Sequence, residues 1–148
     1  MPSPQKWMIG PHAFHFEPPD VLHITYQGAL DPEQAVRMVA LKRELAAACP
    51  LYTVVDMRNA HPLEPEVQRY LSENALGEWF LATIYFGSRL VHRAMIKGIV
   101  LASHATHAQS LAHEQELLRR GLNTIHFTST REEAEQLIQT LRASAFKP

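Results

Sequence analysis

The sequence has only one cysteine, Cys49, among its 148 residues. A single cysteine excludes an internal disulfide bond and a cysteine-rich zinc site. No apolar run reaches the roughly 20 residues that a membrane-spanning helix needs. The first residues, MPSPQKW, also lack a hydrophobic signal segment. We therefore expect a cytoplasmic protein without a transmembrane segment.

A surplus of positive charge is also missing, since 14 Lys and Arg residues stand against 15 Asp and Glu residues. Proteins that follow a phosphate backbone usually carry a large positive surplus, so we expect no nucleic-acid partner. The phosphate-binding patterns GxGxxG and GxxxxGK[ST] are absent, and so is the nucleophile pattern GxSxG. We therefore expect no nucleotide site of these types, no cofactor and no enzymatic activity.

The order of the apolar segments predicts the fold class. Residues 1–11 are rich in proline and are expected to form a flexible arm, followed by a single domain over residues 12–148. Alternating or continuous apolar runs predict strands at residues 12–16, 21–28, 51–55, 80–86 and 123–127. Capping patterns predict helices that start near residues 31, 64, 88 and 130, and residues 104–120 either continue the third helix or form another one.

Strands that alternate with helices indicate right-handed crossover connections. The prediction is therefore an α/β fold with a mostly parallel sheet of roughly five strands. An N-terminal antiparallel hairpin supplies one edge of the sheet, and four to five helices pack on it.

Four segments carry a resemblance to a known family: ITYQGALDPEQA, YTVVDMRNAHPLEPEVQR, ATIYFGS and HFTSTREEAEQLI. With the element order, they resemble the SpoIIAA-like branch of the STAS-like superfamily, the small bacterial STAS/SEC14-type proteins, over most of residues 12–142. Leu63, Glu66 and Arg69 sit where many members have Leu, Glu and Arg. The resemblance implies a STAS-like, non-enzymatic fold that binds protein partners, nucleotides or lipophilic ligands.

One feature of the family is missing from this sequence. In anti-sigma antagonists of this fold, a Ser or Thr at the start of the second helix is phosphorylated to switch partner binding. The matching segment here reads RNAHPLEPE and contains neither residue, with Leu63 or Glu64 in that neighbourhood. A phosphorylation switch at this place is therefore not expected.

A basic stripe on the third helix suggests a partner surface. Arg89, Arg93 and Lys97 recur every four residues, beside His92. We expect Ile96 and Val100 to be exposed next to this stripe, and the helix to turn a different apolar set to the core: Leu90, Val91, Ala94, Met95, Ile99 and Leu101.

Our leading functional prediction from the sequence is a bacterial regulatory or adaptor module that acts by protein–protein interaction. The predicted contact residues are the basic stripe and the start of the second helix: Leu63, Glu64, Glu66, Arg69, Arg89, Arg93 and Lys97. The partner is another protein or a second copy of the chain. A weak peripheral contact with an anionic membrane is an alternative use of the same stripe.

The alternative function is a carrier or sensor of a small lipophilic or anionic ligand. Asp56, Arg58, Asn59 and His61 follow a buried strand, where ligands gather in open α/β sheets. The same residues also suit a solvated loop in which Asp56 accepts hydrogen bonds from backbone amides. A carrier is expected to contain an enclosed apolar cavity of roughly 300–1,000 Å³. Four apolar residues suggest such a cavity, but more often form an ordinary core: Met38, Met95, Trp79 and Phe80.

The third hypothesis is a hydrolytic or metal-dependent enzyme. His104 and His107 are three residues apart and would share one face of a helix, as metal ligands do. The HxxH pattern lacks the Glu of HExxH and identifies no third ligand, and it equally suits a solvated helix face. We therefore expect no bound metal in the purified protein.

Overall fold

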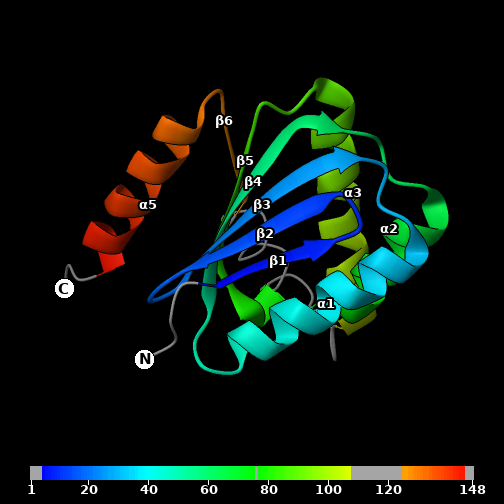
Figure 1. Cartoon of the computed structure of the whole chain (residues 1–148), viewed down its shortest axis with the longest axis horizontal. Helices are drawn as coiled ribbons and strands as arrows, with labels where there is room; N and C mark the ends of the chain where they lie inside the picture. The colour runs from blue at the N-terminus through cyan, green and yellow to red at the C-terminus, as the bar shows by residue number, and fades with distance from the viewer. Residues whose placement is uncertain (1–4, 76, 108–124, 146–148) are drawn as a thin grey trace.

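The computed structural model describes residues 5–75, 77–107 and 125–145. They form an α/β fold around one six-stranded mixed sheet, with the strands in chain order (Figure 1). The strands are β1 (Gln5–Ile9), β2 (His12–Glu17), β3 (Val21–Gly28), β4 (Leu51–Ala60), β5 (Phe80–Phe86) and β6 (Ile125–Thr128). Strands β1 to β3 pair antiparallel and β3 to β6 pair parallel. The predicted α/β class and the antiparallel hairpin of β2 and β3 are confirmed.

Two parts of the sheet differ from the sequence-based prediction. Residues 5–9 of the expected flexible arm form β1, which reaches β2 through a two-residue turn at Gly10, whose φ is 58°. Tight hairpin turns need such positive φ values, which glycine adopts without strain. Strand β4 continues to Ala60 across the expected loop, because Asn59 and Ala60 pair with the end of β3 after an irregularity in the register.

Helices cover the two faces of the sheet unequally. Helices α1 (Pro32–Ala46), α2 (Pro65–Asn74) and α3 (Leu90–His107) lie on one face, and α5 (Arg131–Ala145) lies on the other (Figure 1). A short 3-10 helix, Gly77–Trp79, leads into β5. Among the described residues, no helix combines the length and the apolar character that crossing a membrane would require.

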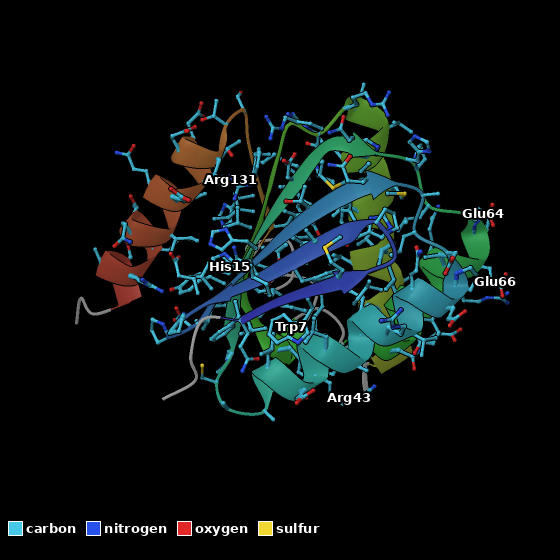
Figure 2. All side chains as sticks on the ribbon, in the orientation of Figure 1. Trp7, His15, Arg43, Glu64, Glu66 and Arg131 are labelled. Atoms are coloured by element: carbon cyan, nitrogen blue, oxygen red, sulfur yellow. The ribbon has the colours of Figure 1, made fainter. Side chains whose placement is uncertain are left out.

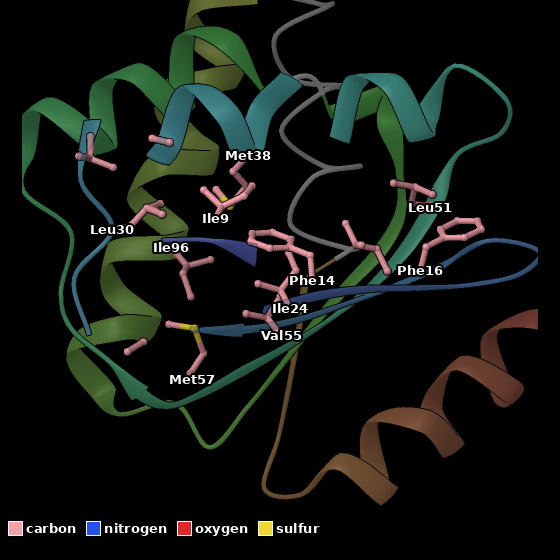
Figure 3. Close-up of a cluster of buried hydrophobic side chains, with 14 residues drawn as sticks. Ile9, Phe14, Phe16, Ile24, Leu30, Met38, Leu51, Val55, Met57 and Ile96 are labelled. Carbon is pink, nitrogen blue, oxygen red and sulfur yellow. The ribbon is translucent and has the colours of Figure 1, made fainter. Parts of the chain in front are cut away.

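The side-chain alternation of β4 shows why both faces are covered. Leu51, Val55 and Met57 pack into the larger core under α1, α2 and α3 (Figure 3). Tyr52 and Val54 point the other way, into a smaller core closed by α5. A parallel strand that is apolar on both faces needs cover on both sides, which explains the continuous apolar run LYTVV.

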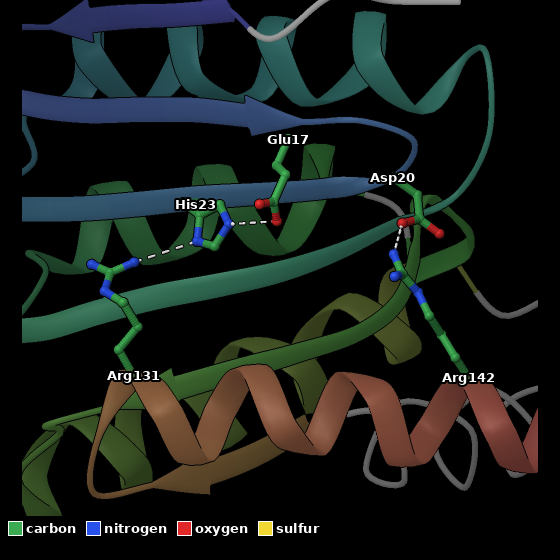
Figure 4. Close-up of polar contacts among 5 residues, drawn as sticks. All are labelled: Glu17, Asp20, His23, Arg131 and Arg142. Carbon is green, nitrogen blue, oxygen red and sulfur yellow. Dashed lines mark hydrogen bonds and ion pairs between the residues drawn. The ribbon is translucent and has the colours of Figure 1, made fainter.

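Helix α5 is held to the sheet by polar contacts as well as by its apolar face. Arg131, at the start of the helix, lies 3.4 Å from Nδ1 of His23, whose other nitrogen is 3.4 Å from Glu17 (Figure 4). Arg142, near the end, pairs with Asp20. These contacts tie the two ends of α5 to β3 and to the turn between β2 and β3, and the helix itself contacts β4, β5 and β6.

Candidate ligand-binding cavity

An apolar cavity of about 170 Å³ lies between the sheet and the helices α1, α2 and α3, partly open to the solvent. Strands β3 to β6 supply one wall and the three helices supply the other. Figure 3 shows three of the lining side chains, Met38, Met57 and Ile96, pointing into the space between the two layers. Gly28 and Ala60, the last residues of β3 and β4, have small side chains and so help to leave this volume unfilled.

Methionines make the cavity wall adaptable. Met38, Met57 and Met95 all line it, and their unbranched thioether chains fill irregular spaces and change conformation at low cost. Two of the sulfur atoms accept hydrogen bonds: Sδ of Met38 from the Tyr26 hydroxyl at 3.1 Å, and Sδ of Met95 from the Leu63 N–H at 3.2 Å. The second bond ties the start of α2 to α3 at the cavity edge.

Two tyrosine hydroxyls provide polar groups inside this apolar wall. Burial raises the pKa of Tyr85 to about 12, and burial together with the nearby Tyr85 raises the pKa of Tyr26 further. Both phenols are therefore neutral at physiological pH and able to donate a hydrogen bond. Tyr26 donates to Met38, whereas Tyr85 has no hydrogen-bond partner among the described residues. As far as the described residues are concerned, the Tyr85 hydroxyl is thus available to a ligand.

Lys42 is the cationic group of the cavity. It lies on α1, one turn after Met38, and its Nζ is 5.5 Å from the centroid of the Phe80 ring. Burial lowers the pKa of Lys42 to about 8, because an ammonium ion is poorly solvated among apolar side chains. In the part of the chain that the structure describes, no carboxylate pairs with it. A lysine that lacks a partner in an apolar cavity is a strong ligand-binding candidate.

The four residues predicted as a ligand site do not come together. Asp56 and Arg58 form a two-bond pair, with N–O distances of 3.0 and 2.7 Å, on the face that α5 covers. Burial alone would raise the pKa of Asp56, but hydrogen bonds and charge from Arg58 outweigh it and lower that pKa. Asn59 is exposed, and only His61 lines the cavity, at its solvent-exposed edge.

The predicted partner residues lie on, or directly before, two neighbouring helices, α2 and α3, that pack against each other. Glu64 and Glu66 point outward from the start of α2 (Figure 2), and Arg69 is also exposed. Leu63 is partly buried against the core. The basic residues are exposed as predicted, with Arg93 and Lys97 on α3 and Arg89 directly before its first residue.

The predicted orientation of the rest of α3 is wrong at most positions, although Met95 and Ile99 do face inward and line the cavity. His92 and Ile96 are buried and Val100 lines the cavity, whereas Leu90 is 83% exposed and Val91 and Leu101 are also exposed. The reason lies in the first turn. Nδ1 of His92 accepts a hydrogen bond from the Arg89 N–H at 3.3 Å, so Arg89, and not Ser88, precedes the helix, and His92 is turned inward.

The arginines of the basic stripe make local contacts that hold them near the surface of the fold. Arg89 donates to the Ala60 carbonyl at 3.4 Å, and the Arg93 guanidinium lies 5.2 Å from the centroid of the Phe127 ring. The stripe is therefore partly ordered by the protein itself, with Lys97 free of such contacts within the described residues.

The two histidines that were predicted as weak metal ligands have side chains outside the described residues. These histidines, His104 and His107, belong to the last turn of α3, and residues 108–124 after them are not described either. Within the described ranges, no three His, Cys, Asp or Glu side chains are grouped so that they could hold one metal ion.

No protein-family model matches the chain, and no curated protein is significantly similar to it in sequence. The STAS-like resemblance thus stays a prediction, and the functional proposal depends on the structure.

Proposed function

We propose that the protein binds a small, mainly apolar ligand that carries an anionic or hydrogen-bond-accepting end. The observation that carries this proposal is the cavity of about 170 Å³, which has apolar walls and a lysine with no ion-pair partner among the described residues. Sequence reasoning placed a ligand site near Asp56 and Arg58, on the opposite face of the sheet. The cavity supports a ligand-binding function at a different place, although its volume of about 170 Å³ is below the roughly 300–1,000 Å³ expected of a carrier.

The volume limits the size of the ligand. A cavity of about 150 Å³ lined by aliphatic and aromatic side chains holds one benzene molecule. Drug-sized ligands need roughly 300–1,000 Å³. At about 170 Å³, this cavity suits a single aromatic ring or a short acyl chain.

The polar groups indicate how the ligand's end would be held. The Lys42 ammonium attracts a carboxylate, and the neutral Tyr85 hydroxyl donates a hydrogen bond to its oxygen. The apolar remainder would pack against the methionines. Benzoate has this combination of one ring and one carboxylate, so it serves as the test ligand.

The test compares benzoate binding by calorimetry and by ligand-detected NMR. Thr83 lines the cavity from β5, and Thr83→Phe fills it with a ring on a strand that tolerates aromatic residues. Leu81→Phe changes an exposed residue on the same strand that does not line the cavity, and serves as the control. We expect binding by the wild type and the Leu81 variant and none by the Thr83 variant. Equal binding by all three, or by none, contradicts the proposal.

A second candidate function is protein binding through the outer surface of α2 and α3, as the STAS-like resemblance implies. The observation that favours it is the exposed apolar group Leu90, Val91 and Leu101 beside the basic stripe. Such a mixture of aliphatic and basic side chains suits a protein interface better than bulk solvent. We also propose that the chain is a STAS-like domain, which the strand and helix order supports.

A charge-reversal variant tests this second function. Substituting Arg89, Arg93 and Lys97 by Glu should abolish binding to a partner or to a second copy. The circular-dichroism spectrum should stay unchanged, because all three side chains are exposed. Sedimentation velocity measures self-association directly. An unchanged association state in a protein that does self-associate would count against this surface.

A further inference from the structure

Lys42 combines two properties that rarely occur together in one lysine. It faces a cavity large enough for an organic molecule, and it has no anionic partner among the described residues. We propose that Lys42 forms a reversible imine with a small apolar aldehyde bound in the cavity. This inference rests on the proposed ligand-binding function and specifies a second ligand class for the same cavity.

The surroundings of Lys42 favour a reactive amine. Its Nζ faces the ring of Phe80 at 5.5 Å, and Leu71, Ala75 and Ile99 line the same cavity. Apart from the face of the Phe80 ring, these groups offer nothing that stabilises an ammonium ion, so burial raises the fraction of neutral amine above that of an exposed lysine. Lys6 and Lys97, the other lysines that the structure describes, are both exposed.

The reaction needs no other reagent. The lone pair of the neutral amine attacks the carbonyl carbon, and a C–N bond forms while the C=O π electrons move to oxygen. A proton passes from nitrogen to that oxygen to give a carbinolamine. The carbinolamine then loses water as the C=N bond forms, and hydrolysis reverses each step. The Tyr85 hydroxyl lines the same cavity and is neutral, so it can donate a hydrogen bond to the carbonyl oxygen.

The expected selectivity follows from the fraction of neutral amine. With a pKa of about 8 in place of 10.5, Lys42 has at pH 7 about 300 times more neutral amine than an ordinary lysine. A less basic amine is also a weaker nucleophile, so we expect a smaller advantage in labelling, about tenfold.

The experiment uses benzaldehyde as the probe and sodium borohydride to reduce any imine to a stable secondary amine. Intact mass spectrometry counts the adducts, and peptide mapping locates them. We expect one adduct per chain on Lys42, no such adduct in Lys42→Arg, and an unchanged adduct in Lys97→Arg. Modification spread evenly over lysines and the amino terminus would overturn the proposal. Mapping of the wild type decides this even if the Lys42 variant fails to fold.

Benzoate separates this inference from the proposed function. If excess benzoate suppresses the Lys42 adduct, both ligands occupy the cavity and both proposals are supported. If benzoate binds and Thr83→Phe abolishes its binding, but Lys42 is not modified, only the imine is refuted. If neither benzoate nor benzaldehyde binds, the ligand-binding function itself is refuted and the imine with it.

Discussion

Lys42 should destabilise the folded protein at neutral pH, and replacing it with methionine should remove that effect. Burial lowers its pKa from 10.5 to about 8. Between these values the unfolded chain binds a proton that the folded protein does not, so stability rises with pH in this window. Methionine has a similar length and is apolar, and it can keep the contact with Phe80.

The magnitude follows from the two pKa values. At pH 7 the protonated lysine costs the fold about 3 kcal/mol relative to a lysine with an ordinary pKa, and at pH 10 about 1 kcal/mol remains. Wild-type stability should therefore gain about 2 kcal/mol between pH 7 and pH 10 relative to the Lys42→Met variant. The raised pKa values of Tyr26 and Tyr85 act in the opposite direction only above about pH 10, and the comparison with the variant cancels them.

Urea unfolding of both proteins at pH 7, 8, 9 and 10, followed by circular dichroism, measures the effect. Lys97→Met, at an exposed position on α3, is the matched control and should differ from the wild type by a constant amount. If the difference between the wild type and Lys42→Met is also constant from pH 7 to pH 10, then Lys42 is not held in an apolar environment. The reasoning about the cavity would then be refuted.

Three further predictions address the cavity and two helix starts. Benzoate should bind about tenfold more weakly for each pH unit above the pKa of Lys42, because the carboxylate needs the charged amine, and calorimetry from pH 7 to pH 10 measures this. Asp31→Ala removes the hydrogen bond at 2.7 Å that caps α1 and should lower the free energy of unfolding by about 1 kcal/mol, measured in urea. Burial, with the nearby charge of Arg89, lowers the pKa of His92 from 6.5. The neutral imidazole therefore contributes fully to stability above pH 6.5, and this contribution is lost as the pH falls below 6.5, because the unfolded chain then binds the proton more tightly. The variant His92→Gln can still accept from the Arg89 N–H and should show a smaller loss of melting temperature from pH 7 to pH 5.

Strands and helices could be predicted from the sequence wherever the local pattern of capping and apolar residues agrees with the packing in the folded protein. Asp31 and Gln34 form both bonds of the predicted capping box. The run LYTVV is buried on both faces, as a central strand should be. Strand β1 was missed because flanking prolines hid a short alternation, in which Trp7 and Ile9 pack on the core and Met8 is 60% exposed. Edge strands of this kind are stabilised mainly by their neighbour, so their own sequence carries a weak signal.

The orientation of α3 could not be read from hydrophobic periodicity. Apolar residues surround most of this helix, so two faces fit the same 3.6-residue repeat. The backbone hydrogen bond to His92 and the burial of Ile96 decide between them. Such contacts depend on where the preceding strand ends, which the sequence does not specify to within one residue.

The candidate site was only partly readable from the sequence, because the apolar residues that line it equally suit an ordinary core, although one further signal was present. Lys42 follows Met38 by four residues, so it falls on the face of α1 that is otherwise turned to the core. A lysine there conflicts with the apolar pattern around it. Asp56 and Arg58 were predicted instead because they lie only two residues apart at the end of a buried run, but alternation along β4 places both on the face opposite the cavity.

The position of Lys42 connects stability to function. At neutral pH an apolar side chain should serve the fold better at this place, since a lysine with a pKa lowered to about 8 is expected to cost about 3 kcal/mol. A ligand carboxylate would neutralise that charge, and an aldehyde would convert the amine to an imine that has a lower affinity for protons. Either ligand would therefore return part of the lost stability to the bound protein, as linkage requires for any molecule that binds only the folded state. Conflicts between a local residue choice and the surrounding fold are concentrated at functional sites, and in the described part of this chain the unpaired lysine in an apolar cavity is the clearest conflict of that kind.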